Sequence, residues 1–268
     1  MHEYNPNRRE GRHRVVYLYG LVILLIVVGG AVAFVALFAS NGANNGNNRN
    51  STPVTNNSET ISVGMHPTIK SKDPCGTLMV KAGPANRVTF TVYAQADSFD
   101  NSTNVQYDQD RTTNTITLIS CPDLMTVPPE TDLALTGNGS ALTVMGVSGT
   151  MKLSMNGGLI ELLQTTLEGR SKIETNGGAI VFIGQLGQES ASVFSCNAGT
   201  LDITLPGEAS YNLRVLGIRG PFISNMPGIQ LDTSETDVPL INVGSQPSYA
   251  TLTFDLAATE VLLHSDSF

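Results

Sequence analysis

An Asn-Gly-Gly sequence that recurs every 20 or 21 residues is the feature that most restricts how this chain can fold. It stands at Asn156-Gly157-Gly158 and Asn176-Gly177-Gly178, and it returns as Asn197-Ala198-Gly199. A weaker copy, Asn138-Gly139-Ser140, comes 18 residues before the first of these. On both sides of each copy, apolar residues alternate with polar ones, which is typical of short strands with one buried face. Each unit therefore predicts two strands that meet at an Asn-Gly turn.

Equivalent positions in successive units carry residues of the same type. Leu153, Ile173 and Phe194 each stand three residues before the asparagine, and apolar residues also stand four and six residues after it. This recurrence favours a β-solenoid, in which each unit is one coil and like residues stack in parallel sheets. The alternative is a meander, in which Asn-Gly forms hairpins between antiparallel strands. We predict an all-β fold, a β-solenoid of about nine coils stacked about 4.8 Å apart.

The turns are the structural site that this pattern predicts. Stacking would bring the asparagine side chains of successive coils together as a ladder, and glycine supplies the φ > 0 conformations that a sharp corner needs. The predicted turn residues are Asn138, Asn156, Gly157, Gly158, Asn176, Gly177, Gly178, Asn197 and Gly199.

An uncharged apolar run occupies residues 15–40. It is longer than the roughly 20 residues that a membrane-spanning helix needs, whereas the apolar region of a cleaved signal peptide is usually about 7–15 residues long. Arginines are concentrated before the run, in residues 1–14, which places the N-terminus in the cytoplasm. We therefore expect a single-pass cell-membrane protein with a short basic cytoplasmic tail (1–14) and a transmembrane helix (15–40) that contacts the lipid bilayer.

The rest of the chain would lie outside the cell. Residues 41–62 are rich in asparagine and nearly free of apolar residues, so they predict a flexible linker. Residues 63–268 are then the extracellular solenoid domain, and they are numerous enough for one domain. The whole chain has 15 Lys and Arg against 23 Asp and Glu, a net charge of −8, which argues against a nucleic-acid partner.

Residues 121–184, which contain the repeats at Asn138, Asn156 and Asn176, carry a resemblance to a known family. The early segment Gly76-Thr77-Leu78-Met79-Val80, the Val127-Pro128 step and the closing Leu205-Pro206 add to it. Over most of residues 70–263 the sequence resembles the bacterial "putative adhesin" family of glycine-punctuated repeat domains, which are similar in style to the heads of auto-transporter adhesins. The resemblance implies a right-handed single-stranded β-helix at the cell surface, and no catalytic residues transfer from it.

Residues 97–110 hold the densest cluster of acidic side chains. Calcium takes about six to eight oxygen ligands, and a loop could supply them, but the EF-hand spacing and the glycine-rich calcium repeat are both absent. A solvated loop between strands is the favoured interpretation, and we expect no cofactor or metal. The cluster consists of Asp97, Asp100, Asn101, Asp108 and Asp110.

Carboxylates within the repeats are predicted to project outward, because Glu161, Glu174 and Asp202 alternate with the apolar positions. A glycosidase needs two carboxylates about 5–9 Å apart. Glu161 aligns with Val181, so the row of carboxylates is interrupted, and we predict no catalytic residues. The histidines are scattered and none forms a metal-binding pair: His2, His13, His66 and His264.

Three cysteines would face an oxidising exterior, where disulfides persist. Cys196 occupies the position of Met155 and Thr175 in the repeat, so it predicts a small buried residue. Cys75 and Cys121 could form a disulfide if their coils are neighbours, although the pairing cannot be deduced from sequence.

The function that these features favour is a non-catalytic rod at the cell surface, held off the membrane by the linker. It would present an adhesive or structural surface to an unidentified glycan or protein. Two alternatives remain open: a membrane sensor that signals through its helix and tail, and a carbohydrate-active enzyme built on a β-helix.

Overall fold

The computed structural model describes residues 57–93, 105–217, 220–226, 229, 237–243 and 250–266, and these residues form an all-β structure. The chain divides into two compact units, Met1–Thr52 and Pro53–Phe268, and every described residue belongs to the second. Within the described residues no helix has the length and apolar character needed to span a membrane. The predicted tail (1–14) and transmembrane helix (15–40) lie outside the described residues.

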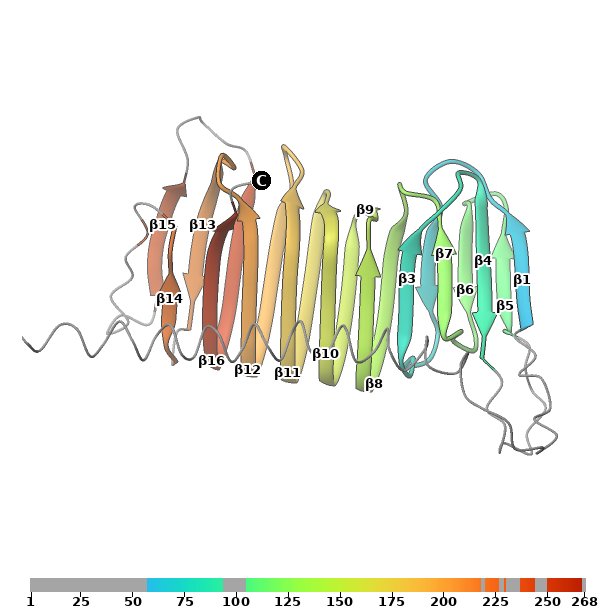
Figure 1. The fold of residues 1–268 in the computed structure, drawn as a ribbon, viewed down its shortest axis with the longest axis horizontal. Coiled ribbons are helices and arrows are strands. Elements are labelled where there is room, and N and C mark those ends of the chain that lie inside the picture. Colours follow the sequence, from blue (N-terminus) through green and yellow to red (C-terminus); the bar gives the residue numbers. More distant parts are fainter. Residues whose placement is uncertain are drawn as a thin grey trace, which may run out of the picture. The chain divides into compact units, whose positions relative to one another are not determined.

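The described residues form sixteen strands, which join in one sheet and lie side by side along one axis (Figure 1). In chain order they are β1 (Asn57–Ser62), β2 (Thr68–Ser71), β3 (Leu78–Ala82), β4 (Arg87–Val92), β5 (Tyr107–Asp110), β6 (Thr115–Leu118), β7 (Leu124–Val127), β8 (Asp132–Met145), β9 (Ser148–Gly149), β10 (Met151–Leu167), β11 (Arg170–Leu186), β12 (Ala191–Pro206), β13 (Tyr211–Leu216), β14 (Phe222–Ser224), β15 (Asp237–Val243) and β16 (Thr251–Asp266).

The repeat units pair in parallel and in register. β10 pairs with β8 on one side and with β11 on the other, and β11 pairs with β12. Leu153 lies opposite Ile173, which in turn lies opposite Phe194, as the repeat predicts. The Asn-Gly segments lie within the long strands, so they do not form the hairpins of a meander. Each unit is thus one long strand that passes through the turn, where two separate strands were predicted.

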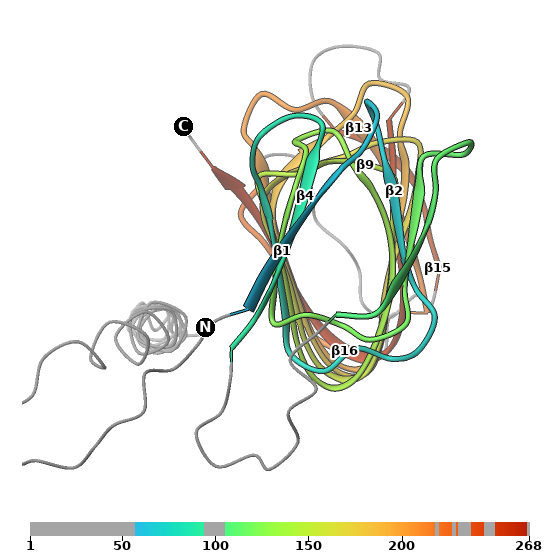
Figure 2. The same cartoon turned by 90° about the vertical axis from the view of Figure 1, so that its right-hand side faces the viewer.

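The core lies inside the stack and is built by every second residue of each strand. Figure 2, a view along the stack, shows strands on both sides of this interior. Leu153, Ile173 and Phe194 are buried, and so are the predicted apolar positions after the turn, such as Ile160 and Ile180. Aromatic rings pack between neighbouring strands: the ring centroids of Phe182 and Phe194 are 5.4 Å apart, and those of Phe194 and Phe254 are 6.3 Å apart. Cys196 is buried, as its position in the repeat predicts.

Spatial order differs from chain order at both ends of the stack. β16, the last strand in sequence, lies between β12 and β13 and pairs in parallel with both. β2 and β3 likewise separate β8 from β6 and β7, which come later in the chain than β2 and β3. In this position Phe254 of β16 lies opposite Phe194 of β12, and the two rings pack together. The chain therefore does not add its units in simple succession.

Antiparallel strands flank the parallel stack at both ends. β4 pairs with β7 and β1 with β4 at one end, while β15 pairs with β13 at the other. Residues 57–62 form β1, so the linker predicted for residues 41–62 extends too far at its C-terminal end. The hydroxyls of Ser58 and Thr60 lie 2.9 Å from those of Thr91 and Thr89, and such cross-strand pairs stabilise a sheet.

Two different constraints require glycine in the turn. Gly157, Gly158 and Gly177 have φ values of 80°, 87° and 80°, which confirms the predicted left-handed conformation. Gly178 and Gly199 do not have a positive φ, so the prediction is wrong for them. They are restricted by close approach: a Cβ at Gly178 would overlap the carbonyl oxygen of Gly158, and one at Gly199 would overlap that of Gly178.

Alanine substitutions should separate the two constraints. We expect Gly178→Ala to lower the free energy of unfolding by about 1–3 kcal/mol, because the added methyl group overpacks the backbone of β10. Gly139→Ala, at a φ of 65° with open space around the Cβ position, should cost about 1 kcal/mol. Urea unfolding followed by circular dichroism would measure both changes.

The matched control is Gly76→Ala, at a position with neither a left-handed φ nor any atom within 4 Å of the added Cβ. It should change the free energy of unfolding by less than about 0.5 kcal/mol. Equal costs at Gly178 and Gly76 would contradict the close-approach argument.

Candidate functional site

The predicted turn residues come together as a ladder of amides on the surface. The Nδ2 of Asn156 donates to the Oδ1 of Asn138 at 3.4 Å, and Asn176 donates to Asn156 at the same distance. Asn197 continues the series and donates to Asn176 at 3.0 Å. All four side chains are exposed. Since each amide group carries two N–H donors, each nitrogen keeps one for a ligand or for water.

A hollow of about 280 Å³ lies beside this ladder and spans β10, β11 and β12. Most of the residues that line the hollow are polar, and they carry hydroxyls, amides and one carboxylate. The polar lining residues are Ser154, Glu174, Thr175, Asn176, Ser195 and Asn197, and Met155 is the one apolar lining residue. Sequence reasoning did not single out Ser154 and Ser195. Their position in the repeat could have identified them. Both stand two residues before the asparagine, as Glu174 does, so they lie on the same outward face as Glu174.

The carboxylate of the hollow is held in its charged form. The Nζ of Lys172 forms an ion pair with the Oε2 of Glu174, on the same face of β11. The hydrogen bond from Lys172 lowers the pKa of the Glu174 carboxyl, and one from Ser154 adds to this effect. Burial acts in the opposite direction but does not prevail. The hollow therefore presents an acceptor to a ligand, and the negative charge of that acceptor is partly neutralised.

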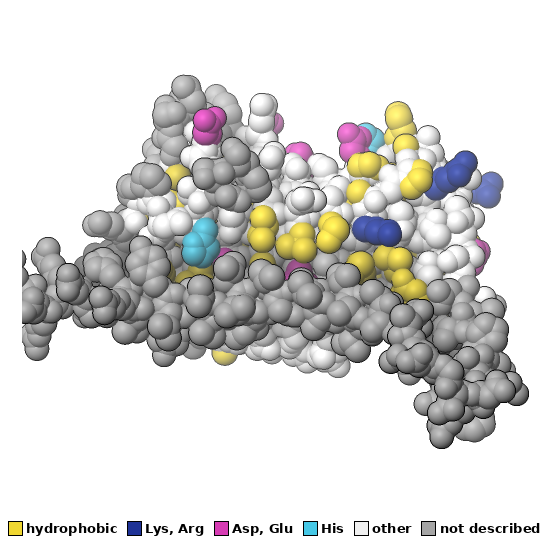
Figure 3. Space-filling view, in the orientation of Figure 1, with side chains coloured by type: hydrophobic (Ala, Val, Ile, Leu, Met, Phe, Trp, Pro, Cys, Tyr) yellow, Lys and Arg dark blue, Asp and Glu magenta, His cyan; other side chains and the backbone are white. Residues whose placement is uncertain are grey.

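On the outer face after the turn, apolar side chains form a row across the strands. Met145, Leu163 and Ile183 occupy equivalent positions of β8, β10 and β11, and Met145 is 39% exposed. Figure 3 shows apolar side chains gathered over this part of the stack. Beside the row, a β-bulge at Gln164, with a φ of 53°, borders a second hollow of about 250 Å³ that Gln185 also lines. This hollow lacks a charged residue in its lining.

The carboxylates of the repeat project outward as predicted, and each has its own partner. Glu161 accepts a hydrogen bond from the Thr143 hydroxyl at 3.0 Å. Asp202 lies 3.6 Å from the Nε2 of His264, a pairing that the spacing of the histidines did not predict. Burial raises the pKa of Asp202, while the nearby His264 lowers it. Glu161 and Asp202 are separated by Val181 of β11, which stands between them in register.

The acidic cluster considered for calcium is only partly described. Asp97, Asp100 and Asn101 lie outside the described residues, whereas Asp108 and Asp110 lie on β5. Asp110 accepts hydrogen bonds from the backbone N–H of Thr112 and from the hydroxyl of Thr113, and these bonds lower the pKa of its carboxyl. Its carboxylate thus stabilises the turn between β5 and β6. Among the described residues no group of three or more His, Cys, Asp or Glu side chains is placed to hold a metal ion.

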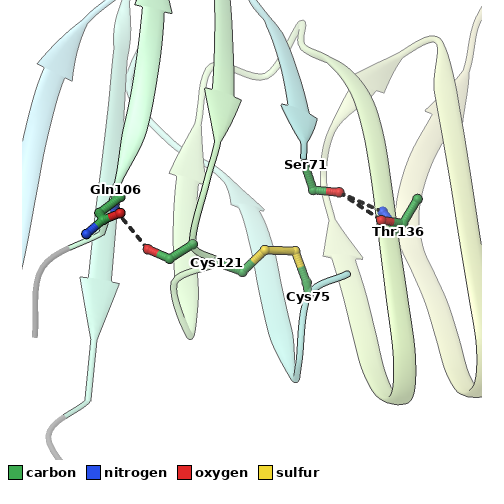
Figure 4. Close-up of a disulfide and its surroundings, with 6 residues drawn as sticks. Ser71, Cys75, Gln106, Cys121 and Thr136 are labelled. Carbon is green, nitrogen blue, oxygen red and sulfur yellow. Dashed lines mark hydrogen bonds between the residues drawn. A yellow bond between two sulfur atoms is a disulfide. The ribbon is translucent and has the colours of Figure 1, made fainter. Parts of the chain in front are cut away.

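A disulfide joins Cys75 to Cys121, with the Cα atoms 5.4 Å apart (Figure 4). Cys75 lies between β2 and β3, and Cys121 between β6 and β7, so the bond links two adjacent units. Cys75 also accepts and donates backbone hydrogen bonds at β8, with its N–H 2.7 Å from the Thr136 carbonyl oxygen. The Ser71 hydroxyl accepts from the Thr136 N–H nearby. The disulfide therefore ties the parallel repeats to the strands at the N-terminal end of the stack.

Removal of this disulfide should destabilise the domain. It closes a loop of 46 residues, and a loop of that length predicts a loss of about 3–4 kcal/mol in the free energy of unfolding. Urea unfolding of the Cys75→Ser/Cys121→Ser double variant would measure this loss. Cys196→Ser is the control for the substitution itself, and a loss no greater than that control would contradict a stabilising bond.

Removal of the Lys172 side-chain charge should raise the pKa of Glu174 toward its ordinary value. The stabilisation from the charged Glu174 is present above its unfolded-state pKa and is lost as the pH falls through the lower folded-state pKa. Lys172→Gln should diminish that loss. An NMR titration of the Glu174 carboxyl would detect the pKa change. The matched control is Lys152→Gln, at the equivalent position of β10, and an equal shift in both variants would contradict the ion pair.

No protein-family model matches the sequence, and no curated protein matches it significantly. The structure is similar to that of a putative cell adhesion protein from Clostridium sporogenes, with a TM-score of 0.47 and 10% identity over 79% of this chain and 100% of that chain. It is also similar to that of a putative adhesin from Bacteroides fragilis, with a TM-score of 0.27 and 12% identity over 78% of this chain and 97% of that chain. Both names are those of adhesion proteins, the class that the sequence resembles.

Proposed function

We propose that this protein is a non-catalytic, membrane-anchored surface protein whose C-terminal domain presents a binding surface outside the cell. The observation that carries the proposal is the asparagine ladder with its adjoining hollow. Parallel stacking repeats the same outward residue from unit to unit and so produces an extended polar surface from Asn138 to Asn197. Extended surfaces of this kind are what repeat proteins use for binding.

In this proposal the domain is a right-handed β-solenoid of about nine coils. The parallel, in-register pairing of β8, β10, β11 and β12 supports it, and so does the alternation of buried and outward residues along each of these strands. The antiparallel strands at both ends would then act as caps that cover the open edges of the stack.

The non-catalytic role is supported by the way the repeat carboxylates are arranged. Catalysis needs groups that converge on one reacting centre within hydrogen-bond reach. Glu161 and Asp202 stand two strands apart in register, and Glu174 lies before the turn, paired with Lys172. Each of these carboxylates has a different partner, and they do not line a common hollow. This arrangement supports a structural role at the surface and not a catalytic one.

The membrane anchor rests on the sequence. The apolar run of residues 15–40 is long enough to span a bilayer, and the arginines before it place the N-terminus inside the cell. With this orientation, the folded domain lies outside and the asparagine-rich residues connect it to the membrane.

Protease added to intact cells tests the orientation. We expect it to release a fragment that begins within residues 41–56, because this segment is rich in asparagine and precedes β1. N-terminal sequencing of the released fragment would locate the cut, and an intact cytoplasmic marker protein would serve as the control. A fully protected domain would contradict the extracellular placement.

The binding role needs a second measurement. Cells that carry the full chain should adhere to immobilised matrix extracts more strongly than cells that carry only residues 1–62, with equal surface levels verified by an epitope tag. Equal adhesion of the two cell types would contradict the proposed function.

A further inference from the structure

We infer that the hollow beside the asparagine ladder is the binding site for an uncharged saccharide chain. The inference rests on the proposed function, since it names the ligand class of that surface. The polar groups in the lining come from three successive strands, β10, β11 and β12, and include two serine hydroxyls, two asparagine amides and the Glu174 carboxylate. The hydroxyls both donate and accept hydrogen bonds, the amides offer N–H donors, and the carboxylate accepts. This mixture suits the hydroxyl groups of a sugar, which also donate and accept.

The period of the surface matches a chain of repeating units. Neighbouring parallel strands lie about 4.8 Å apart, so the amides of Asn156, Asn176 and Asn197 recur at roughly that interval. A pyranose ring in an extended saccharide chain has a similar length. A saccharide that lies along the ladder can therefore direct one hydroxyl to each amide in turn, whereas the lining of the second hollow holds two amides, those of Gln164 and Gln185.

The charge of the lining favours an uncharged ligand over an acidic one. Glu174 is the one ionisable residue among those that line the hollow, and its lowered pKa keeps it negative at neutral pH. Its partner Lys172 lies next to the lining and partly balances this charge. The carboxylate of a uronic acid residue would be repelled by the Glu174 carboxylate, whereas a neutral hexose or N-acetylhexosamine carries no charge that Glu174 would repel.

Isothermal titration of the full-length protein in detergent micelles tests the inference. The probes are cellohexaose, maltohexaose and chitotetraose, with tetragalacturonate as the acidic comparison. We expect at least one of the three neutral probes to bind at millimolar or lower concentration, and tetragalacturonate to bind more weakly than that probe.

Two matched variants locate the binding. Ser195→Trp fills the hollow beside the ladder without removing an asparagine, and it should weaken binding at least tenfold. Thr166→Trp places the same side chain in the second hollow, of similar volume, and should leave the affinity within twofold. Circular dichroism melting would verify that both variants fold, and Asn176→Leu provides a second test if Ser195→Trp does not fold.

Failure of this inference is distinct from failure of the proposed function. If no neutral probe binds, or if both tryptophan variants weaken binding equally, the saccharide site is refuted even where cells that carry the chain still adhere. Saturable binding of an extended peptide in place of the saccharides would also refute it. The proposed function itself would be refuted if cells with the full chain adhered no better than cells with residues 1–62 and if protease added to intact cells released no fragment.

Discussion

Backbone hydrogen bonding between successive repeat units is the constraint on which the rest of this domain depends. Parallel pairing in register sets each residue beside its counterpart in the next unit, so every position must tolerate a like neighbour a few ångströms away. In the interior this favours stacks of apolar side chains, and Phe194 and Phe254, which lie opposite each other in register, pack in this way. At the turn it acts against side chains, because a Cβ at Gly178 or Gly199 would meet the carbonyl oxygen of the preceding unit.

The same constraint explains what the sequence could and could not predict. Stacking turns a sequence period into a spatial register, so the neighbours of Leu153 and the asparagine ladder could be read from the spacing of the repeats. Alternation shows which residues face inward, but it does not show which unit lies next to which. The position of β16 between β12 and β13 was therefore not predictable, and neither was the proximity of His264 to Asp202 that follows from it. The hollow was missed for a related reason, since Ser154 and Ser195 could be placed on the outer face although the depth of that face could not.

Both ends of the stack change from parallel to antiparallel pairing, and the residues there differ accordingly. An unprotected edge strand would offer its backbone groups to another chain. At the N-terminal end, β1 and β4 pair through hydroxyl side chains, and the Tyr107 hydroxyl donates to Glu59 at 2.6 Å. This hydrogen bond, with a smaller effect of burial, raises the pKa of Tyr107 to about 12, so the tyrosine stays protonated and the bond persists through neutral pH. Charged Asp108 and Asp110 lie on β5, where like charges discourage further pairing.

The division between a constrained interior and a permissive exterior determines where binding chemistry can reside. Inward positions are committed to packing, so a change of residue there disturbs two neighbouring units at once. Outward positions bear no such cost, yet the asparagines remain the same over four units, because each amide is bonded to the next. The series stops at β16, where Ala257 stands opposite Asn197. The amide surface is thus a bounded strip along the stack. A ligand that bonds all four asparagines must be extended and must lie across the strands, which is the geometry of a linear polymer.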